Sequence, residues 1–464
     1  MNRIGTAELA RLLGDWSSGS GSLARQLATA LRTLAHTGLI PAGALLPPER
    51  QLAQSLAVSR STLVTALDLL RSEGVVRSRQ GSGTIVESST APSDLGGEPR
   101  VLAQLLRAER GIDLSAAAPW GARHLPPLAL DLDDLLAADP AHGYGPRGLR
   151  SLRTLLAARA VHAGTPTATE EILVTNGAQQ GLHLALRVLA SRGSSVVVER
   201  PTYPGLLDAL ADLGLSPVPV DRHDGGIDLD QLRRALPRAR VAYVQPIVHN
   251  PTGGALDEHT LVRLAEIYDA WGGTVIEDLA LADLRHDGPR LRPLAARCRS
   301  AGVVSIESLS KLAWAGLRLG WVRAPADVID RLSHQRHAAD LGTSIPSQIL
   351  AMSLLAELDD LAARRRVALA QAAERTGAQL ASALPDWAVP QPQGGCALWV
   401  TLPVLDATPL VQLAQRDGVF VAPGSAADPL AQPSPSVRIS IDRPEPQLDA
   451  AVSRLQSAWA RLGV

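Results

Sequence analysis

The chain has 464 residues, and hydrophobic side chains make up 46% of them, which is enough to bury the cores of two or three domains. No apolar run is long and uninterrupted enough to span a bilayer, and the N-terminus lacks the charged start and apolar stretch of a signal peptide. The two cysteines, Cys298 and Cys396, show no metal-binding or redox spacing. We therefore expect core thiols, no metal site and a location in the cytoplasm.

The net charge of -1 hides an uneven distribution along the chain. Residues 1–86 contain nine arginines against five Asp and Glu residues, a balance of +4, so the remaining residues carry -5. A basic segment joined to an acidic body is expected if only the basic segment meets phosphate groups. Solvated surface arginines would give the same count, so charge alone does not decide between the two.

The first strongly periodic segments predict three helices. Apolar residues recur at helical spacing over 23–34, and a glycine follows where that helix should end. Pro48 fits the first turn of a short helix that continues to Leu56. After a short turn, Ser59 is a good N-cap for a third helix, which Gly74 closes.

A small β-hairpin is predicted over 75–86, with a glycine-rich tip at 81–83. Three helices and a hairpin form a winged helix-turn-helix, in which the second helix of the turn enters the major groove of DNA. The first turn of that helix exposes Arg60, Ser61 and Thr62, whose side chains can meet base edges and phosphates.

The stretch LPPERQLAQSLAVSRSTLVTALDLLRSEGVVRSRQGSGTIV closely resembles the GntR family of regulators. The resemblance implies that Arg50, Arg60 and Thr62 contact double-stranded DNA, and that Gly81 lets the wing approach the DNA backbone. For Arg50 or Arg60 alone, a solvated surface charge is the alternative. Residues 1–86 are therefore expected to form a DNA-binding domain.

Residues 87–111 are polar and predict a linker, with a short helix at 101–107. From 112 to 464, strand-like runs alternate with helical stretches, which predicts an α/β domain around a mostly parallel sheet. The strand-like runs lie at 172–174, 196–198, 241–244, 274–276 and 303–306, and helical stretches at 180–189 and 261–271. Ligands are expected at the carboxyl ends of such strands.

Lys311 is the only lysine among the 45 Lys and Arg residues. Arginine can replace lysine as a surface charge, but it cannot attack an aldehyde carbonyl as a neutral primary amine can. Lys311 is therefore the candidate catalytic residue, able to form a Schiff base, although a single lysine can also survive by chance.

Residues around this lysine predict a phosphate site. Gly177, Ala178 and Gln179 follow a strand and open a helix, whose N-terminal N–H groups form a seat for an anion. Ser308 and Arg318 flank the lysine and can add hydroxyl and guanidinium contacts to the same phosphate.

Four further side chains suit a pyridoxal ring and an amino-acid ligand. Asp278 can hold a pyridine nitrogen in its protonated form, and Asn250 can donate to a phenolate oxygen. Tyr203 can stack on the ring, and Arg438 can bind a carboxylate bidentately. Each residue alone is more often structural, but the full set together with a single lysine favours a functional site.

Residues 112 to 460 resemble an aminotransferase of PLP fold type I. The marks of the resemblance are 144–148, 177–179, 250–253, Asp278, 308–311, Arg318 and Arg438. Joined to a GntR-like head, such a domain resembles the MocR regulators over nearly the whole chain. The resemblance implies pyridoxal 5'-phosphate (PLP) as cofactor and a head-to-tail homodimer with its sites at the subunit interface, where Tyr144 reaches the partner's phosphate.

One position departs from the MocR pattern. Those proteins usually carry a tyrosine two positions after the aspartate that binds the pyridine nitrogen, and this chain has Ala280 there. The missing hydroxyl puts efficient transamination in doubt more than cofactor binding, because Lys311, Asp278 and the phosphate groups are kept.

Two hypotheses follow from these patterns. The first is a DNA-binding transcriptional regulator that senses PLP, or an aldimine of PLP with a small amino compound, and has weak or no transaminase activity. The second is an active PLP-dependent aminotransferase with an accessory DNA-binding domain. We favour the regulator, because an aminotransferase needs no wing or recognition helix. A DNA-binding protein without cofactor would leave Lys311, Asp278 and Arg318 unexplained.

Overall fold

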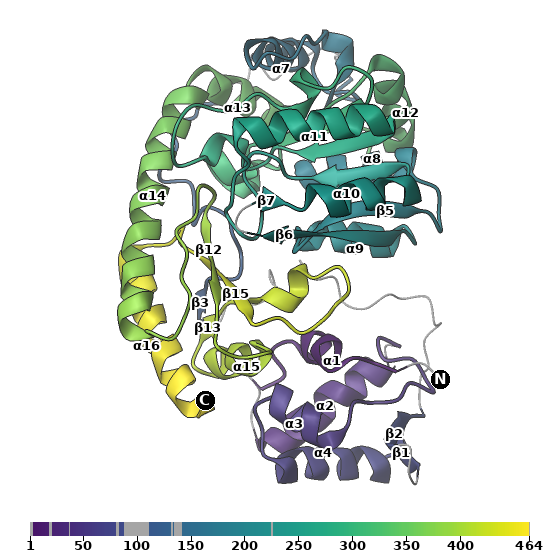
Figure 1. Cartoon of the computed structure of the whole chain (residues 1–464), viewed down its shortest axis with the longest axis vertical. Coiled ribbons are helices and arrows are strands. Elements are labelled where there is room, and N and C mark those ends of the chain that lie inside the picture. The colour runs from purple at the N-terminus through teal and green to yellow at the C-terminus, as the bar shows by residue number, and fades with distance from the viewer. Residues whose placement is uncertain are drawn as a thin grey trace.

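The computed structural model describes residues 3–17, 21–36, 38–79, 83–87, 111–130, 133, 142–223 and 226–463. Figure 1 shows three parts along the long axis: an N-terminal body, which we call the head, then a small subdomain, then a large subdomain at the far end. Helix α14 (Leu358–Ala383) runs along one side of the two subdomains and connects them. The predicted fold class, a winged helix-turn-helix followed by an α/β domain with a mostly parallel sheet, is confirmed.

The head consists of helices and a two-stranded hairpin. Its elements are α1 (Thr6–Leu13), α2 (Leu23–His36), α3 (Glu49–Ser55), α4 (Arg60–Ser72), β1 (Val76–Arg79) and β2 (Gly83–Val86). As predicted, Ser59 caps α4, and its hydroxyl accepts a hydrogen bond from the backbone N–H of Thr62 at 3.0 Å. The sequence pattern did not predict α1, whose buried leucines join the core of the head together with Trp16. The predicted wing residue Gly81 and the predicted helix at 101–107 lie outside the described residues.

The large subdomain is built on a sheet in the order β4-β11-β10-β9-β8-β5-β6-β7. Its strands are β4 (Ile172–Thr175), β5 (Ser195–Arg200), β6 (Ser216–His223), β7 (Gly226–Ile227), β8 (Val241–Val244), β9 (Thr274–Asp278), β10 (Gly302–Ser308) and β11 (Gly320–Arg323). The central strands from β10 to β6 are parallel, whereas β11 runs antiparallel to both of its neighbours. All five predicted strands are present.

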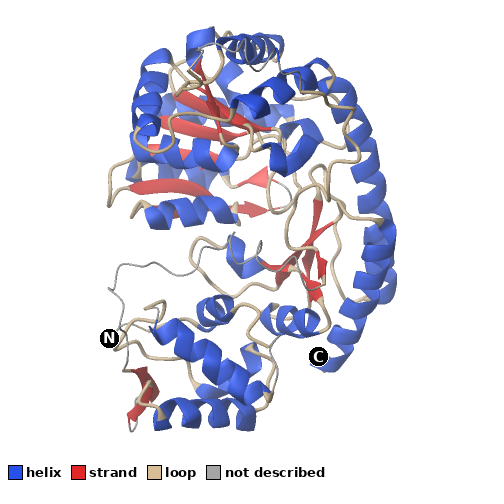
Figure 2. Ribbon diagram, turned by 180° about the vertical axis from the view of Figure 1, so that it is seen from behind, coloured by secondary structure: helices blue, strands red, loops and turns tan. Residues whose placement is uncertain are grey.

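Helices cover both faces of this sheet, as the view from behind in Figure 2 also shows. They are α7 (Arg150–His162), α8 (Ala178–Leu189), α9 (Pro204–Asp212), α10 (Leu229–Ala235), α11 (Glu258–Trp271), α12 (Ala326–His337) and α13 (Ile345–Ala356). Alternate residues of β5 serve the two faces: Val196 and Val198 pack with α8, α9 and α12, whereas Val197 packs with α10 and α11. Because the central strands are covered twice, they appear in the sequence as continuous apolar runs.

The small subdomain combines segments from both ends of the aminotransferase-like region. Its elements are β3 (Ile112–Asp113), β12 (Ala397–Thr401), α15 (Thr408–Arg416), β13 (Val419–Phe420), β14 (Ala422–Pro423), β15 (Ser436–Ser440) and α16 (Glu445–Leu462). Three strands form a sheet in the order β12-β15-β14, and β13 pairs with β3. The pairing of β13 with β3 places residues 113–118 between the two subdomains, beside the cavity described below.

Within the described parts of the chain, no helix is both long and apolar enough to cross a membrane. The same residues contain no group of three or more His, Cys, Asp or Glu side chains arranged to hold a metal ion.

Candidate functional site

A cavity of about 390 Å³ lies at the carboxyl ends of the parallel strands and is closed on one side by the small subdomain. Ten of the eleven site residues predicted for this part of the chain line it, and Tyr144 is the exception. The residues converge because parallel strands bring their carboxyl ends to one edge of the sheet. The cavity can bind an anionic heterocycle, because it is lined by backbone N–H groups, one amine, one carboxylate and two guanidinium groups.

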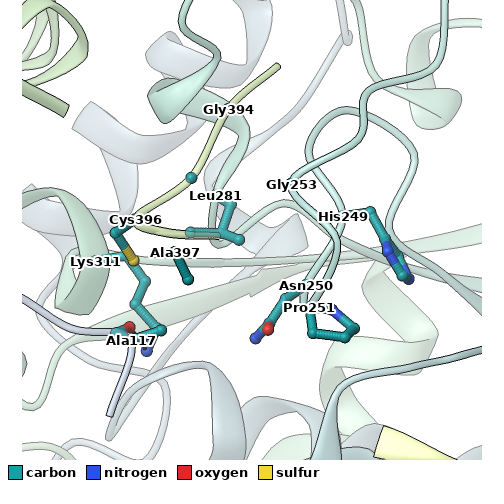
Figure 3. Close-up of a pocket in the computed structure, with 11 residues that line it drawn as sticks. Ala117, His249, Asn250, Pro251, Gly253, Leu281, Lys311, Gly394, Cys396 and Ala397 are labelled. Atoms are coloured by element: carbon teal, nitrogen blue, oxygen red, sulfur yellow. Dashed lines mark hydrogen bonds between the residues drawn. The ribbon is translucent and has the colours of Figure 1, made fainter. Parts of the chain in front are cut away.

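Lys311 reaches this cavity from an unusual backbone turn. It lies in a π-helical turn, Ser310–Trp314, that follows β10, and such turns are frequent at functional sites. Its Nζ donates a hydrogen bond to the carbonyl of Ala117 at 2.5 Å (Figure 3). Burial lowers the pKa of the Lys311 amine, and Arg438 adds to this effect while Cys396 and Asp278 oppose it. A larger neutral fraction makes the amine a better nucleophile toward a carbonyl.

Asp278, the last residue of β9, presents a buried carboxylate to the same cavity. Its Oδ2 accepts hydrogen bonds from the hydroxyl of Tyr243 at 2.6 Å and from Nε2 of Gln245 at 3.4 Å. Its Oδ1 accepts from the backbone N–H of Ala280 at 2.9 Å. Burial raises the pKa of Asp278, and these three donors act against that rise. A cationic partner such as a protonated ring nitrogen would favour the ionised carboxylate further.

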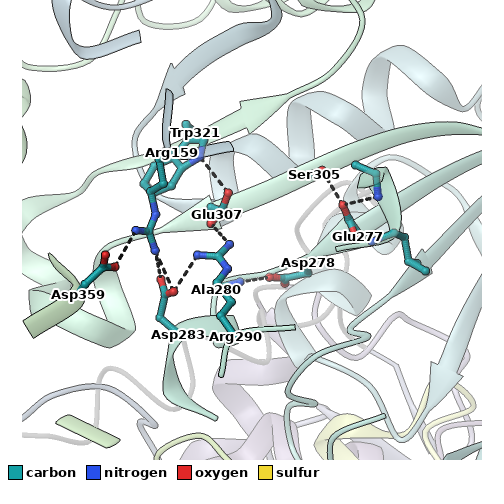
Figure 4. Close-up of polar contacts among 12 residues, drawn as sticks. Arg159, Glu277, Asp278, Ala280, Asp283, Arg290, Ser305, Glu307, Trp321 and Asp359 are labelled. Carbon is teal, nitrogen blue, oxygen red and sulfur yellow. Dashed lines mark hydrogen bonds and ion pairs between the residues drawn. The ribbon is translucent and has the colours of Figure 1, made fainter. Parts of the chain in front are cut away.

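Polar contacts hold the segment around Asp278 from two sides (Figure 4). The side chain of Glu277 accepts from Ser305 Oγ and from the backbone N–H of Leu294, both at 2.7 Å. Five residues after Asp278, Asp283 accepts from Arg159 at 2.8 and 2.9 Å and from Arg290 at 2.7 Å. Arg290 also donates to Glu307 at 2.6 Å. These bonds limit the freedom of the backbone on either side of Asp278, so the direction of its carboxylate is fixed by the fold.

The residues predicted to form an anion seat lie at the start of α8 and line the cavity. Gly177 is the N-cap residue of this twelve-residue helix and has a positive φ of 84°. A Cβ atom at Gly177 would lie 3.3 Å from Nη2 of Arg318, which is tighter than an ordinary contact. Arg318 itself adopts the left-handed conformation with φ 50° and donates to the carbonyl of Asn176 at 2.7 Å. The helix N-terminus and the guanidinium group therefore face the same part of the cavity.

Ser308 lies beside this seat at the end of β10. Its hydroxyl donates to the carbonyl of Leu319 at 3.1 Å and lies 2.9 Å from Oγ of Ser310, a second hydroxyl that lines the cavity. Gln179 also lines the cavity, and its Nε2 donates to the carbonyl of Gly205 at 2.7 Å.

Arg438 and Asn250 form a pair on the opposite side of the cavity. Nη1 of Arg438 donates to Oδ1 of Asn250 at 2.9 Å, and Nη2 donates to the carbonyl of Ser115 at 2.6 Å. Because Oδ1 of Asn250 is engaged, the amide NH₂ group is the part of that side chain left to donate into the cavity. Tyr203 lies nearby, and burial raises the pKa of its phenol, so its hydroxyl stays protonated.

Among the site's residues that were not predicted, four make contacts that matter for its chemistry. Tyr243 lies in β8 and Gln245 directly follows the end of that strand, and both side chains donate to Oδ2 of Asp278. Gln245 also accepts from the backbone N–H of Asn250 at 3.0 Å, so one amide links the carboxylate to the Asn250 loop. A polar residue directly after an apolar strand is the signal that could have revealed Gln245.

The other two unpredicted residues are Ala117 and Cys396. Ala117 contributes only its carbonyl group, which no sequence pattern marks as functional. Cys396 belongs to the buried core, as expected, but it also lines a pocket together with Lys311 (Figure 3). Cys298 is partly buried against the core beside α11, in agreement with a core thiol.

Two residues singled out in the sequence, Tyr144 and Ala280, differ in their relation to the cavity. Tyr144 is 62% exposed and does not line the cavity of its own chain. Ala280 lines the cavity two residues after Asp278, so the position where MocR-like proteins usually have a tyrosine carries a methyl group.

The head presents the predicted DNA-contacting residues on its surface. Arg50 and Ser61 are exposed, Thr62 is half-buried, and the Arg60 side chain is 76% exposed with a guanidinium nitrogen 3.8 Å from Glu49. The hydroxyls of Ser61 and Thr62 each lie 2.8 Å from Oγ of the cap residue Ser59. The first turn of α4 is therefore an accessible polar end, as a recognition helix requires.

Comparison with protein-family models gives two matches along the chain. Residues 23–86 match the bacterial regulatory proteins of the gntR family. Residues 109–455 match aminotransferase class I and II. The helix α1 and Trp16 lie before the first match.

Similar proteins include both regulators and enzymes. The HTH-type transcriptional regulator YdfD of Bacillus subtilis is 28% identical over 86% of this chain and 89% of its own length. The probable rhizopine catabolism regulatory protein MocR of Rhizobium meliloti is 28% identical over 66% of each chain. The solved structure of LysN, the α-aminoadipate aminotransferase of Thermus thermophilus, superposes with a TM-score of 0.70 at 26% identity over 79% of this chain and 95% of that one. It holds N-(5'-phosphopyridoxyl)-L-leucine.

Proposed function

Since this chain belongs to the MocR-type transcriptional regulators, in which a GntR-type helix-turn-helix precedes an aminotransferase class I and II domain, we propose that its aminotransferase-like domain binds PLP at Lys311 and serves as a sensor. The sensed molecule is PLP, alone or joined to a small amino compound. The observation that carries the proposal is the convergence of a pKa-lowered lysine amine, a buried carboxylate and an anion seat in one cavity.

The residues of the cavity fit PLP in their chemistry. The N-terminus of α8, Arg318 and Ser308 suit the phosphate, Asp278 suits the protonated ring nitrogen, and Asn250 suits the phenolate oxygen. Glycine suits position 177 because its φ is 84° and a Cβ atom there would lie 3.3 Å from Nη2 of Arg318. PLP supplies an aldehyde that condenses with primary amines and a ring that accepts electrons. The protein supplies the lysine, the orientation and the electrostatic surroundings.

A relative supports the amino-acid part of the proposal. The LysN structure holds a phosphopyridoxyl group joined to leucine, which has one carboxylate. In the present chain, Arg438 is the guanidinium that faces the cavity from the small subdomain, where it can receive such a carboxylate. The amino group would compete with Lys311 for the aldehyde. Following the resemblance to the MocR regulators, we also propose a head-to-tail homodimer in which the exposed Tyr144 of each subunit completes the partner's phosphate site.

The first experiment is to trap PLP on Lys311. Protein incubated with PLP should turn yellow, and borohydride reduction should fix a PLP-sized mass on the peptide that contains Lys311. The Lys311→Arg variant keeps the positive charge and should lose the covalent bond. A mass found on another peptide, or none with PLP in excess, would show that the proposal is wrong.

The second experiment concerns DNA. The helix-turn-helix implies DNA binding, and the affinity should fall steeply with salt because the basic head displaces counterions from phosphate. Arg60→Ala should lose sequence discrimination if Arg60 reads a base, or weaken all DNA alike if it contacts only phosphate. Failure to shift any fragment of its own upstream region, in every ligand state, would contradict a regulatory role.

The alternative function is an active aminotransferase, which the full set of cavity residues also permits. Ala280 argues against it, because the hydroxyl usually found at this position is absent. We expect binding of amino compounds with slow or absent formation of keto product. Turnover near ~10 s⁻¹, typical of dedicated enzymes, with unchanged DNA affinity, would make the enzyme the primary function.

A further inference from the structure

The head is attached to the small subdomain by a contact between residues far apart in the sequence. Trp16, which follows α1, donates its indole N–H to Oε1 of Gln412 on α15 at 3.0 Å. The guanidinium of Arg416, at the end of the same helix, lies 5.4 Å from the centroid of the Trp16 ring. Trp16 is 6% exposed and Gln412 is 5% exposed, so the contact excludes water from both polar groups.

Arg416 binds the turn of the helix-turn-helix itself. It donates to the carbonyls of Leu56 at 2.6 Å and Ala57 at 2.8 Å. These carbonyls lie at the end of α3, where a helix leaves acceptors without intrahelical partners and where its dipole favours a cation. Ala57 has a left-handed backbone, with φ 49°, and two residues later Ser59 caps the recognition helix α4. The guanidinium therefore stabilises the strained turn that sets the angle between α3 and α4.

The same end of α15 is connected to the cavity by short segments. After Arg416 the chain continues into β13 and β14, and in β14 Ala422 pairs with Arg438 of β15. Strand β13 pairs with β3, which leads to Ser115 and thus to the carbonyl that accepts from Arg438. A shift of Arg438 toward a bound carboxylate would therefore act on two strands that lie directly after Arg416.

We propose that Trp16, Gln412 and Arg416 form a docking contact between the head and the small subdomain. Through this contact, occupancy of the carboxylate site at Arg438 changes how firmly Arg416 binds the turn between α3 and α4. This inference rests on the proposed function for its ligand, but the contact itself does not depend on PLP. Figures 1 and 2 show α4 on the side of the head away from the small subdomain, so a docked head leaves the recognition helix open to DNA. The ligand alters regulation to the extent that it binds the docked and released states with different affinity.

Hydrogen exchange can test the contact in the full-length protein without cofactor. The backbone N–H groups of Leu56, Ala57 and Val58 are all bonded within the turn. Arg416→Ala should accelerate their exchange roughly tenfold or more, because losing a charge-assisted pair of bonds costs on the order of 1.4 kcal/mol or more and that energy is a factor of ten. Arg416→Lys should give a smaller effect, since lysine cannot bind both carbonyls in the same planar geometry. Trp16→Phe is a second, milder variant: it keeps an aromatic ring near Arg416 but removes the indole N–H that donates to Gln412.

The matched control is Arg263→Ala, which removes an exposed arginine from α11 in the large subdomain. It should leave exchange at the turn unchanged. If Arg416→Ala retains its circular dichroism spectrum and also leaves the exchange of Leu56–Val58 unchanged, the docking contact does not exist in solution.

The coupling is tested with two probes that differ in the carboxylate. N-(5'-phosphopyridoxyl)-L-leucine carries one, and pyridoxamine 5'-phosphate does not. Only the first should change exchange at Leu56–Val58, by roughly threefold or more, and Arg416→Ala should abolish the change. Equal responses to both probes, or no response although absorbance shows that the leucine probe is bound, would overturn the coupling. If neither probe binds, the proposed function and the coupling both fail, whereas the Arg416→Ala effect on exchange would still establish the contact.

Discussion

Arg443 should stabilise residues 113–118, the segment with which the small subdomain forms one wall of the cavity. It donates to the backbone carbonyls of Asp113 at 2.7 Å, Ala116 at 2.9 Å and Ala118 at 2.9 Å. These residues surround Ala117, whose own carbonyl accepts from the candidate catalytic lysine. Residues 115–118 form no regular secondary structure, and Arg443 bonds the carbonyls of two of them, Ala116 and Ala118.

The size of the effect follows from burial. Arg443 is 9% exposed, and its guanidinium bonds to three backbone carbonyls and lies 3.9 Å from Oδ2 of Asp113, so its charge depends on these partners rather than on water. Burial lowers the pKa of this guanidinium, and Asp113 and Asp442 act against that change. Charge-assisted hydrogen bonds contribute about 1.5–3 kcal/mol each, but deletions are not additive, and water entering the vacated space satisfies part of the carbonyls. We therefore expect Arg443→Ala to lower the free energy of unfolding by about 3–5 kcal/mol, the range found when one partner of a buried pair is removed.

Two measurements separate this positioning role from general destabilisation. Urea unfolding gives the loss of stability, and an absorbance titration with PLP below the unfolding transition gives the dissociation constant. Arg443→Lys should recover part of the stability, since an ammonium can bind some of the three carbonyls, but should still weaken PLP binding roughly tenfold, because the wall is no longer held at three points.

Arg454→Ala is the matched control. Arg454 is exposed on α16 and donates to the carbonyls of Asp417 at 3.1 Å and Gly418 at 3.4 Å, away from the cavity. Its loss should cost no more than about 1 kcal/mol, as is usual for exposed bonds, and should leave PLP binding unchanged. If Arg443→Ala behaves like Arg454→Ala in both measurements, the proposed role of Arg443 is wrong.

Two shorter predictions concern single positions in the large subdomain. Gly148→Ala should lower the free energy of unfolding by about 2–4 kcal/mol in urea melts, because its φ is +86° and the new Cβ would lie 2.5 Å from Val174. The control is Gly193→Ala, which has a similar φ of +83° but open space around it, and it should show only the backbone strain of about 1 kcal/mol. Ala280→Tyr should raise keto-acid formation from a bound amino compound about tenfold or more in a coupled assay, since it restores a hydroxyl two residues after Asp278; an unchanged rate would remove Ala280 as the reason for slow turnover.

Local signals in the sequence were sufficient for the elements that carry the site. The apolar runs predicted the strands because the central strands are covered on both faces, and Ser59 predicted the start of α4 because an N-cap acts on its own helix. Most of the cavity residues could be predicted as a set because parallel strands bring their ends together, whereas Arg438 comes from the separate sheet of the small subdomain.

Contacts that depend on tertiary packing could not be predicted. Nothing in the sequence distinguishes Arg443 from the other arginines. Only the pairing of β3 with β13 brings residues 113–118 within hydrogen-bonding distance of its side chain. Trp16 and Arg416 are separated by 400 positions, and neither lies in a pattern that requires the other. Tyr243 lies inside an apolar run, where an aromatic side chain is usual, so its bond to Asp278 leaves no mark on the sequence.

The bond between Tyr243 and Asp278 leads to a prediction about pH. Burial raises the pKa of Asp278 from its ordinary value of 3.8, so the folded protein binds a proton here more tightly than the unfolded chain does. The stability that this group contributes is therefore complete below the unfolded pKa and is lost as pH rises through the folded one. The Tyr243 hydroxyl acts against this loss, because its bond at 2.6 Å favours the ionised carboxylate.

Tyr243→Phe should thus raise the pKa of Asp278 further and destabilise the protein without cofactor more at about pH 8 than at about pH 4, near the ordinary carboxyl value, with a difference of about 1–2 kcal/mol. PLP, with a protonated ring nitrogen facing Asp278, should restore part of the loss at the higher pH, because a cation favours the same ionised form. Tyr268→Phe, which alters another buried tyrosine on α11, should show no such dependence on pH. Equal losses at both pH values for Tyr243→Phe, measured by urea unfolding, would mean that Asp278 does not titrate in response to this bond, and its proposed role toward a ring nitrogen would lose its electrostatic basis.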